Sequence, residues 1–203
     1  MSAFIRSDVL GDLRDLSQFF TAMPEVTSKA VSLAMNDVSE RKAVPAIRRE
    51  TESQVAFPKG YLDSPDRLGV TKRASPNNLE VVITARDRPT SLARFAPGQT
   101  PENTRGKPLY VQVKRGRTVR LNKAFMVRLK NGNIGLAVRL KPGESLRNKT
   151  DMKAVALANN VYLLYGPSVD QVFRTVADSA APEIGTQIGN EFYRQFARLS
   201  RSK

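Results

Sequence analysis

The residue types that most enzymes use for catalysis are largely missing from this chain of 203 residues. It contains neither cysteine nor histidine, which excludes disulfides, thiolate nucleophiles, Ser-His-Asp triads and the usual zinc sites. Carboxylate or lysine chemistry stays open in principle, but the chain has no paired-carboxylate pattern, P-loop or GxGxxG motif. We therefore predict a protein that is not an enzyme and uses no cofactor or metal.

The positive charge of the chain is concentrated in its middle third. Residues 67–153 hold 20 Lys and Arg against 5 Asp and Glu, whereas residues 1–66 hold 8 against 10 and residues 154–203 hold 5 against 4. The net charge of +14 therefore comes almost entirely from one segment. Such a concentration indicates a surface that faces a polyanion or an acidic partner protein.

Seven of these cations fall in or beside predicted strands and are our candidate residues for polyanion contact: Lys114, Arg115, Arg117, Arg120, Arg128, Lys130 and Arg139. The alternative is an ordinary solvated sheet face. The sequence shows no alternation of aromatic and basic residues of the kind that stacks single strands. It also has no helix-turn-helix or zinc pattern that would enter a groove. Any nucleic acid would therefore be held by its phosphate backbone, without sequence reading.

The elements that must position these cations centre on a predicted hairpin over residues 124–140. Asn131-Gly132 separates two alternating runs, and this dipeptide favours a two-residue type I′ turn. That turn pairs Leu129 with Ile134, and likewise Val127 with Leu136 and Phe125 with Val138. The expected result is one apolar face, with Arg128 and Arg139 on the opposite face beside Lys130.

A central strand and a helix are predicted after this hairpin. Val161–Tyr165 shows little alternation, which is typical of a strand inside a sheet. Gly166-Pro167 ends it, and Ser168 with Gln171 forms a capping box that opens a helix. One apolar stripe then follows on that helix, at Val169, Val172, Phe173 and Val176.

Helical spacing also predicts helices near both ends of the chain. One covers residues 8–22, and another runs from Pro24 to about Ser53, with Pro45 kinking or breaking it. A C-terminal helix begins near Pro182, and its Phe192 and Phe196 serve either the core or a subunit contact. Gly185 and Gly189, which are costly in a helix, favour close approach of another backbone.

The remaining segments are a hairpin and a long loop. Residues 68–74 and 79–85 form two strands joined by four residues. Residues 87–108 are rich in proline and glycine and are long for a loop in a compact domain. Leu92 and Phe95 form an apolar island in this loop, which either docks onto a neighbour or belongs to a mobile loop.

These elements predict an α+β fold, with an antiparallel, hairpin-rich β-sheet packed by N-terminal and C-terminal helices and carrying a long extended loop. We divide the chain into an N-terminal helical region (1–56), a basic β-sheet region (57–166) and C-terminal helices (167–203), all in one domain. No apolar run is long enough to predict a membrane span.

Several of these features resemble the minor tail protein Z family of tailed bacteriophages and prophages, within the wider group of neck and tail-completion proteins. The resemblance covers nearly the whole chain. Its most specific part is Leu163-Leu164-Tyr165-Gly166-Pro167-Ser168-Val169, and it extends to the break at Val44-Pro45, the segment Ser91–Phe95, the hairpin through Gly132 and the closing helix from Glu191.

The resemblance implies a structural virion protein without an active site. Such subunits assemble into a homo-oligomeric ring at the head–tail junction or the tail end, around the channel through which DNA leaves. The implied partners are copies of the chain, neighbouring tail or connector proteins and the backbone of double-stranded DNA in transit. The implied location is the virion, after assembly in the host cytoplasm. Our candidate residues for subunit contact are Leu92, Phe95, Tyr165, Phe192 and Phe196.

Two alternatives stay open at this point. In the first, the basic residues meet an acidic surface of the adjoining tail ring instead of DNA. Alternatively, the chain is a free basic protein that binds nucleic acid through phosphate contacts, without assembling into a particle.

Overall fold

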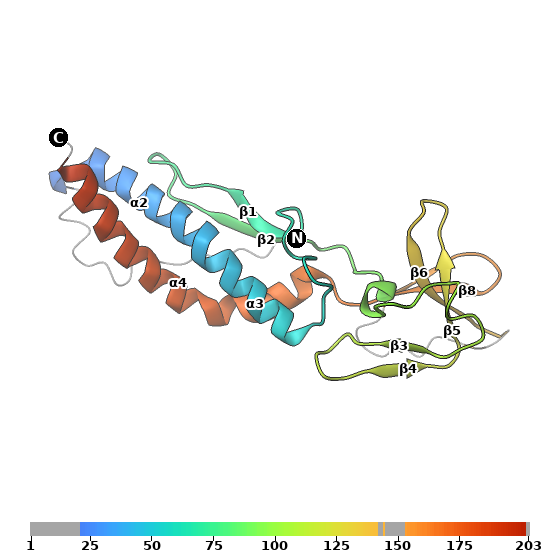
Figure 1. Ribbon diagram of the computed structural model, residues 1–203. Coiled ribbons are helices and arrows are strands. Elements are labelled where there is room, and N and C mark those ends of the chain that lie inside the picture. Colours follow the sequence, from blue (N-terminus) through green and yellow to red (C-terminus); the bar gives the residue numbers. More distant parts are fainter. Residues whose placement is uncertain (1–20, 142–143, 145–152, 202–203) are drawn as a thin grey trace. The chain divides into compact units, whose positions relative to one another are not determined.

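The computed structural model describes residues 21–141, 144 and 153–201, so the helix predicted over residues 8–22 lies almost wholly outside the described part (Figure 1). The chain forms two compact units. The first comprises residues 1–51, 62–86 and 173–203, and the second comprises residues 52–61 and 87–172. Helices and antiparallel hairpins make up the structure, which confirms the predicted α+β class.

A long helical segment opens the first unit. It consists of α2 (Pro24–Val38), the π-helical turn η1 (Ser39–Ala43) and α3 (Val44–Gln54), without a break at Pro45. Proline cannot donate a backbone hydrogen bond and crowds the preceding turn. The wider turn of η1, in which the Val44 amide donates to the Ser39 carbonyl, lies directly before it. A π turn is a usual way for a helix to absorb such a local conflict.

The predicted hairpin of the first unit is confirmed as β1 (Leu68–Lys72) and β2 (Val82–Ala85), which pair antiparallel with an irregularity after Val70. It is tied to the helical segment by polar contacts. The Asn36 side chain bonds both the amide and the carbonyl of Ala74, at 2.8 and 2.9 Å. These bonds hold the hairpin against α2.

The C-terminal part of the chain is one helix, α4 (Val169–Ser200), and not two helices separated near Pro182. Pro182 lies inside it. The expected stripe is buried at Ile184, Ile188 and Phe192. No described part of this chain approaches Gly185 or Gly189 closely, because a Cβ added at either position would meet no atom within 4 Å.

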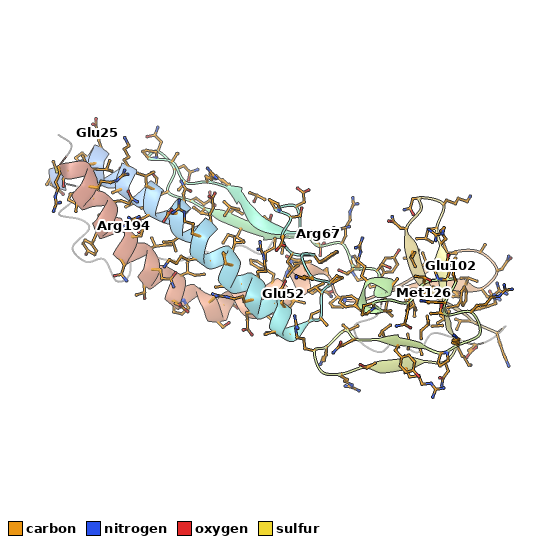
Figure 2. The ribbon with its side chains drawn as sticks, viewed as in Figure 1. Glu25, Glu52, Arg67, Glu102, Met126 and Arg194 are labelled. Atoms are coloured by element: carbon orange, nitrogen blue, oxygen red, sulfur yellow. The ribbon has the colours of Figure 1, made fainter. Side chains whose placement is uncertain are left out.

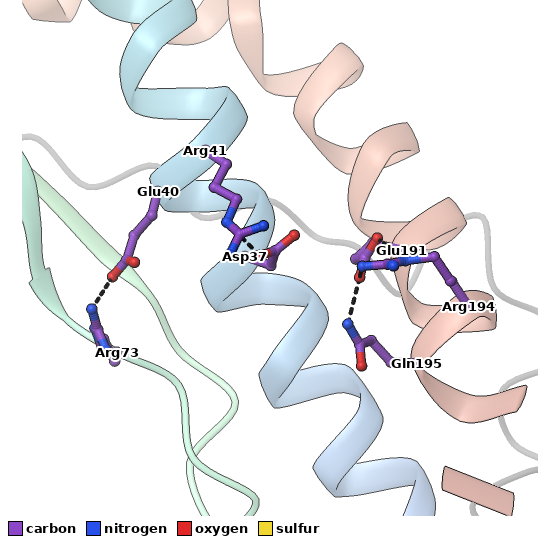
Figure 3. Close-up of polar contacts among 7 residues, drawn as sticks. All are labelled: Asp37, Glu40, Arg41, Arg73, Glu191, Arg194 and Gln195. Carbon is purple, nitrogen blue, oxygen red and sulfur yellow. Dashed lines mark hydrogen bonds and ion pairs between the residues drawn. The ribbon is translucent and has the colours of Figure 1, made fainter. Parts of the chain in front are cut away.

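Charged side chains form ion pairs and hydrogen bonds within two neighbouring helical segments, α2 with η1 and α4, which Figure 1 shows side by side and Figure 3 shows in detail. Glu191 accepts hydrogen bonds from Arg194 at 2.6 and 2.8 Å and from Gln195 at 2.6 Å. Asp37 pairs with Arg41 at 2.9 Å. The pKa of Glu191 is lowered mainly by the hydrogen bonds from Arg194. The hydrogen bond from Gln195 and the positive charges of Arg194 and Arg41 lower it further.

We predict that Glu191→Gln lowers the melting temperature at neutral pH and that the difference from the native chain disappears in acid. The side chain of Glu191 is only 14% exposed. Because its folded pKa is lowered, its stabilising effect is present above the ordinary glutamate pKa and is lost as pH falls through the folded value. Melting curves from pH 7 to 3 measure this. Glu183→Gln is the matched control, since Glu183 is exposed on the same helix and accepts a hydrogen bond from the Gln187 side chain at 2.9 Å. An unchanged difference across this pH range would contradict the assignment.

The second unit contains a four-stranded antiparallel sheet in the order β5-β6-β8-β7. Its strands are β5 (Ala124–Arg128), β6 (Ile134–Arg139), β7 (Lys153–Ala156) and β8 (Val161–Tyr165). β8 matches the predicted strand and is internal to the sheet, as its sequence indicated.

The register predicted for the β5–β6 hairpin was wrong by one residue. Arg128 pairs with Ile134, and the Leu129 amide donates to the Asn133 carbonyl at 2.8 Å. The loop therefore contains three residues and not two. The Gly132 amide donates to the Leu129 carbonyl at 2.9 Å, and Gly132 has φ +78°. A three-residue hairpin loop takes this form, with glycine in the left-handed region after a tight turn.

This one-residue difference redistributes the apolar side chains over both faces of the sheet. Successive side chains of a strand alternate, so a shift in pairing moves one partner strand to the other face. Phe125, Val127 and Leu129 lie with Ala137 and Leu163 on one face. The opposite face of the sheet carries Met126, Leu136, Ile134 and Val138.

The long loop docks within its own unit. The short 3-10 helix η2 (Leu92–Phe95) buries both Leu92 and Phe95. Before it, the Thr90 amide donates to the Pro167 carbonyl at 3.3 Å and the Gly166 amide donates to the Thr90 carbonyl at 2.8 Å. The apolar island therefore fills the core of the second unit.

The capping box that opens α4 is confirmed. The Ser168 amide donates to Gln171 Oε1 at 2.9 Å, and the Gln171 amide donates to Ser168 Oγ at 3.0 Å. The predicted stripe of this helix, including Val169 and Phe173, is buried.

Candidate polyanion-binding surface

The hairpin of β3 (Leu109–Val111) and β4 (Val119–Leu121) presents one buried and one exposed face. Leu109 and Val111 point into the unit and are buried. Tyr110, between them, is 46% exposed and pairs directly with the exposed Arg120 on β4. An aromatic ring and a guanidinium group therefore lie side by side on the outer face of this hairpin.

The turn of this hairpin holds three further cations in place. The Arg117 amide donates to the Lys114 carbonyl at 3.2 Å, and Gly116 has φ +74°, as a type II turn requires at its third position. Arg115 Nε donates to the backbone carbonyl of Glu52, the residue labelled in Figure 2. These contacts anchor the turn through its backbone and one guanidinium group, while Lys114 and Arg117 stay exposed.

The end of the β5–β6 hairpin carries Arg128 and Lys130, both exposed. Arg128 forms an ion pair with Glu102 at 3.1 Å. The pKa of Glu102 is lowered, first by the hydrogen bond from the Thr100 side chain and then by its own backbone amide and by Arg128. Arg128 is therefore partly neutralised, whereas Lys130 has no carboxylate partner among the described residues.

The seven candidate cations do not form the single face that we expected. All seven are exposed. The observed register places Arg128 and Arg139 on opposite faces of the sheet, which corrects the predicted basic face. Figure 1 also shows the β3–β4 turn and the β5–β6 turn at different ends of the second unit. The structure therefore brings together one compact group, which we call the β3–β4 basic group: Lys114, Arg115, Arg117 and Arg120.

Charge divides unequally between the two units. The second unit contains 17 Lys and Arg against 6 Asp and Glu, a net charge of +11, which leaves +3 for the first unit. Within the described residues, Lys114, Arg117 and Arg120 form no ion pair with a carboxylate. The β3–β4 basic group is therefore free to attract an anion from outside the chain.

The five candidate subunit-contact residues differ in their accessibility. Leu92, Phe95 and Phe192 are buried within the chain itself and offer no surface to a neighbour. Phe196 is partly exposed and packs on Phe192 with the ring centroids 5.8 Å apart. Tyr165 is partly exposed and belongs to the apolar cluster of the four-stranded sheet.

The exposed pair of Tyr110 and Arg120 was missed by sequence reasoning, which found no aromatic residue interleaved with the cations. The alternation of Leu109, Tyr110 and Val111 does place the tyrosine on the outer face of a strand. Its proximity to Arg120 depends on the pairing of β3 with β4, which lie eight residues or more apart along the chain.

Other kinds of site find no counterpart in the described part of the chain. No three His, Cys, Asp or Glu side chains of residues 21–141, 144 and 153–201 gather as a metal site would need. Among the same residues, no helix combines the length and apolar character of a membrane span.

No family model, curated protein or solved structure matches this chain.

Proposed function

We propose that this protein is a structural subunit of a tailed bacteriophage virion, a tail-completion or neck protein that assembles with copies of itself into a ring around the DNA channel. The observation that carries the proposal is the β3–β4 basic group, which is exposed and lies in a unit of net charge +11. Three of its four cations have no carboxylate partner among the described residues. The resemblance of residues 163–169 to the minor tail protein Z family supplies the assignment to a tail or neck.

The chemistry of the β3–β4 basic group suits a surface past which DNA moves. Lys and Arg bind phosphate oxygens of any sequence, and the affinity falls steeply as salt competes. Lys114, Arg117 and Arg120 are long, exposed side chains. They would attract the DNA backbone into the channel without holding one sequence in place.

The segment that carries the resemblance performs a clear structural task. It begins in β8, turns at Gly166 and Pro167, and opens α4 through the capping box of Ser168. A Cβ at Gly166 would lie 2.9 Å from Cε2 of Phe95, so glycine is required for the docking of η2. This segment thus fixes both the loop and the long helix, which a subunit held between neighbours requires.

A second candidate function is a free protein that binds nucleic acid through its phosphates. The pairing of exposed Tyr110 with Arg120 favours it, because base stacking on an aromatic ring beside a cation is common in proteins that bind single strands. This candidate differs from the first in requiring neither self-assembly nor a particle.

The decisive experiment follows the protein in phage particles. Deleting its coding sequence from the parent phage or prophage is expected to leave heads and tails unjoined or tails unstable, as seen by electron microscopy. Adding the purified protein should restore joining, and mass measurement of the isolated protein should show oligomers. A stable monomer that is absent from purified particles, while intact particles form without it, contradicts the proposal. If that monomer also shifts nucleic acid in a gel at low salt, the second candidate is favoured.

A further inference from the structure

Strand β7 is an edge strand with an exposed apolar side. Among the described residues, the order β5-β6-β8-β7 gives it a neighbouring strand only on its β8 side. All four of its residues are exposed, including Val155 at 51%, and the following Leu157 is 48% exposed. Large apolar side chains that recur at alternate positions of a free edge mark a site where another strand can add.

The backbone groups that face away from β8 can be identified. The Leu157 amide donates to the Val161 carbonyl at 2.8 Å. In an antiparallel ladder, alternate residues direct their N–H and C=O groups toward the neighbouring strand. Val155 therefore faces β8 with its backbone, while Ala154 and Ala156 direct theirs outward. Their small side chains leave these groups open to a further strand.

The exposed side chains of β7 continue the apolar face of the sheet. Val155 pairs with Leu163, which pairs with Ala137, which in turn pairs with Phe125. Leu163 and Ala137 are buried in the apolar cluster, and Phe125 is partly buried. An added strand would extend this row of apolar contacts beyond its present edge.

Charged side chains protect the other edge strand of the sheet, β5. Lys123, directly before it, pairs with Glu144 at 2.9 Å, and Arg128 at its end pairs with Glu102 at 3.1 Å. Charged side chains and covering loops are usual means of protecting an edge strand. Within the described residues, β7 has only Lys153 for this purpose. In the part of the chain that the structure describes, the unprotected edge is therefore β7.

We propose that β7 pairs antiparallel with β7 of a second copy of this chain, about a two-fold axis at Val155. This register follows from the backbone directions. Residues that exchange hydrogen bonds across an antiparallel pair lie directly opposite each other. Ala154 then faces Ala156 of the second copy, and the two Val155 side chains form the closely spaced pair that exchanges no hydrogen bonds.

The same register makes β7 complementary to itself in charge and in shape. Lys153 of one copy lies opposite Leu157 of the other, so its alkyl stem covers an apolar side chain while the ammonium group stays in water. The two lysines lie at opposite ends of the pair, and neither copy needs an acidic group. DNA offers no extended peptide backbone to satisfy Ala154 and Ala156, so a second copy fits this edge better than the polyanion does.

This inference goes beyond the proposed function, because pairing through β7 requires neither DNA nor a virion. A two-fold contact joins copies in pairs, so other surfaces must close a ring. Five residues on each side form less than the roughly 1,000 Å² that stable complexes bury. We therefore expect weak pairing in isolation, which calls for a trapping experiment.

The test uses the absence of cysteine from the native chain, so a single introduced cysteine can form a disulfide only with another copy. In the proposed register the two Cα atoms of residue 155 are about 4.5 Å apart, within the range that a disulfide spans. The full-length Val155→Cys variant is expected to form covalent dimers under mild oxidation at least about tenfold faster than Val119→Cys. The reason is that pairing through β7 raises the effective concentration of one introduced thiol around the other. Val119 is the matched control, since it is a valine in a strand of the same unit and 41% exposed.

A second variant tests the backbone pairing itself. Ala154→Pro in the Val155→Cys chain removes an outward N–H without disturbing the bonds to β8, and proline is tolerated at such edge positions. It is expected to reduce the rate of dimer formation to that of Val119→Cys, with an unchanged circular dichroism spectrum. Equal rates for Val155→Cys and Val119→Cys, or rapid dimer formation that survives Ala154→Pro, would overturn the proposal. If particles still assemble with the Ala154→Pro variant, assembly does not need the β7 pairing. That result would leave the proposed function standing.

Discussion

Replacing Phe95 with alanine is expected to lower the free energy of unfolding of the second unit by about 3–5 kcal/mol, the cost typical of removing a buried phenylalanine. Phe95 is buried, and its ring lies 5.6 Å from that of Phe57, which stacks in turn on Tyr61 at 5.5 Å. Its backbone carbonyl accepts the Gln112 amide at 2.8 Å. The cavity left by the ring would therefore lie where the long loop, residues 57–61 and β3 meet.

Tyrosine fluorescence during urea denaturation can measure this effect. The chain has no tryptophan, and four of its five tyrosines belong to the second unit. The signal therefore reports mainly on the unit in which Phe95 lies. Tyr61, close to the new cavity, should be among the groups most affected.

Two control variants separate packing from general perturbation. Phe95→Leu keeps most of the apolar volume and should cost much less than the alanine variant, by the usual tolerance for substitutions that conserve volume. Val119→Ala shortens an exposed side chain of the same unit and should change stability by no more than about 0.5 kcal/mol. A loss below about 1 kcal/mol for Phe95→Ala would show that the loop does not dock as described.

Neutralising the free cations of the β3–β4 basic group is expected to give the largest loss of polyanion binding. In the Lys114→Gln, Arg117→Gln, Arg120→Gln triple variant, each lost phosphate contact should reduce the slope of log affinity against log salt by about 0.9. The three contacts together should weaken binding to a duplex of mixed sequence many-fold at low salt and much less at high salt. All three side chains are exposed, so the fold should be retained.

Fluorescence anisotropy with labelled duplex DNA over a series of salt concentrations provides the measurement. The matched control is Lys29→Gln, Lys42→Gln, Arg49→Gln, which removes the same charge from exposed positions in the first unit. If both triple variants lose affinity and salt slope equally, the attraction depends on net charge alone and the β3–β4 basic group is not a site. Adding Tyr110→Ala to the first triple variant tests stacking, because only single-strand binding should then fall further.

Local sequence patterns anticipated many elements of the fold. The capping box at Ser168 and Gln171, the strand Val161–Tyr165 and the hairpin of β1 and β2 all depend on interactions between residues close together in the chain. Short-range hydrogen bonds and alternation are visible in the sequence itself. The concentration of charge in one segment is likewise a property of composition, which folding does not change.

Patterns failed where two local solutions have similar energies. The Asn131-Gly132 dipeptide is compatible with either a two-residue or a three-residue loop, and the structure contains the latter. Pro45 indicated a kink or a break and Pro182 indicated the start of a helix, yet helices continue through both positions. The packing of a long apolar face evidently outweighs a lost hydrogen bond at each proline.

The sequence by itself determined the fold class, the positions of several elements, the lack of cysteine and histidine chemistry and the segment that carries the charge. Only the tertiary structure decided which cations share a surface, because a one-residue change in loop length reverses the faces of a whole strand. It also decided that Leu92 and Phe95 are buried within their own chain, since their partners Phe57 and Gly166 lie far from them in the sequence. Contacts between distant residues depend on how all elements pack together, and no local pattern contains that information.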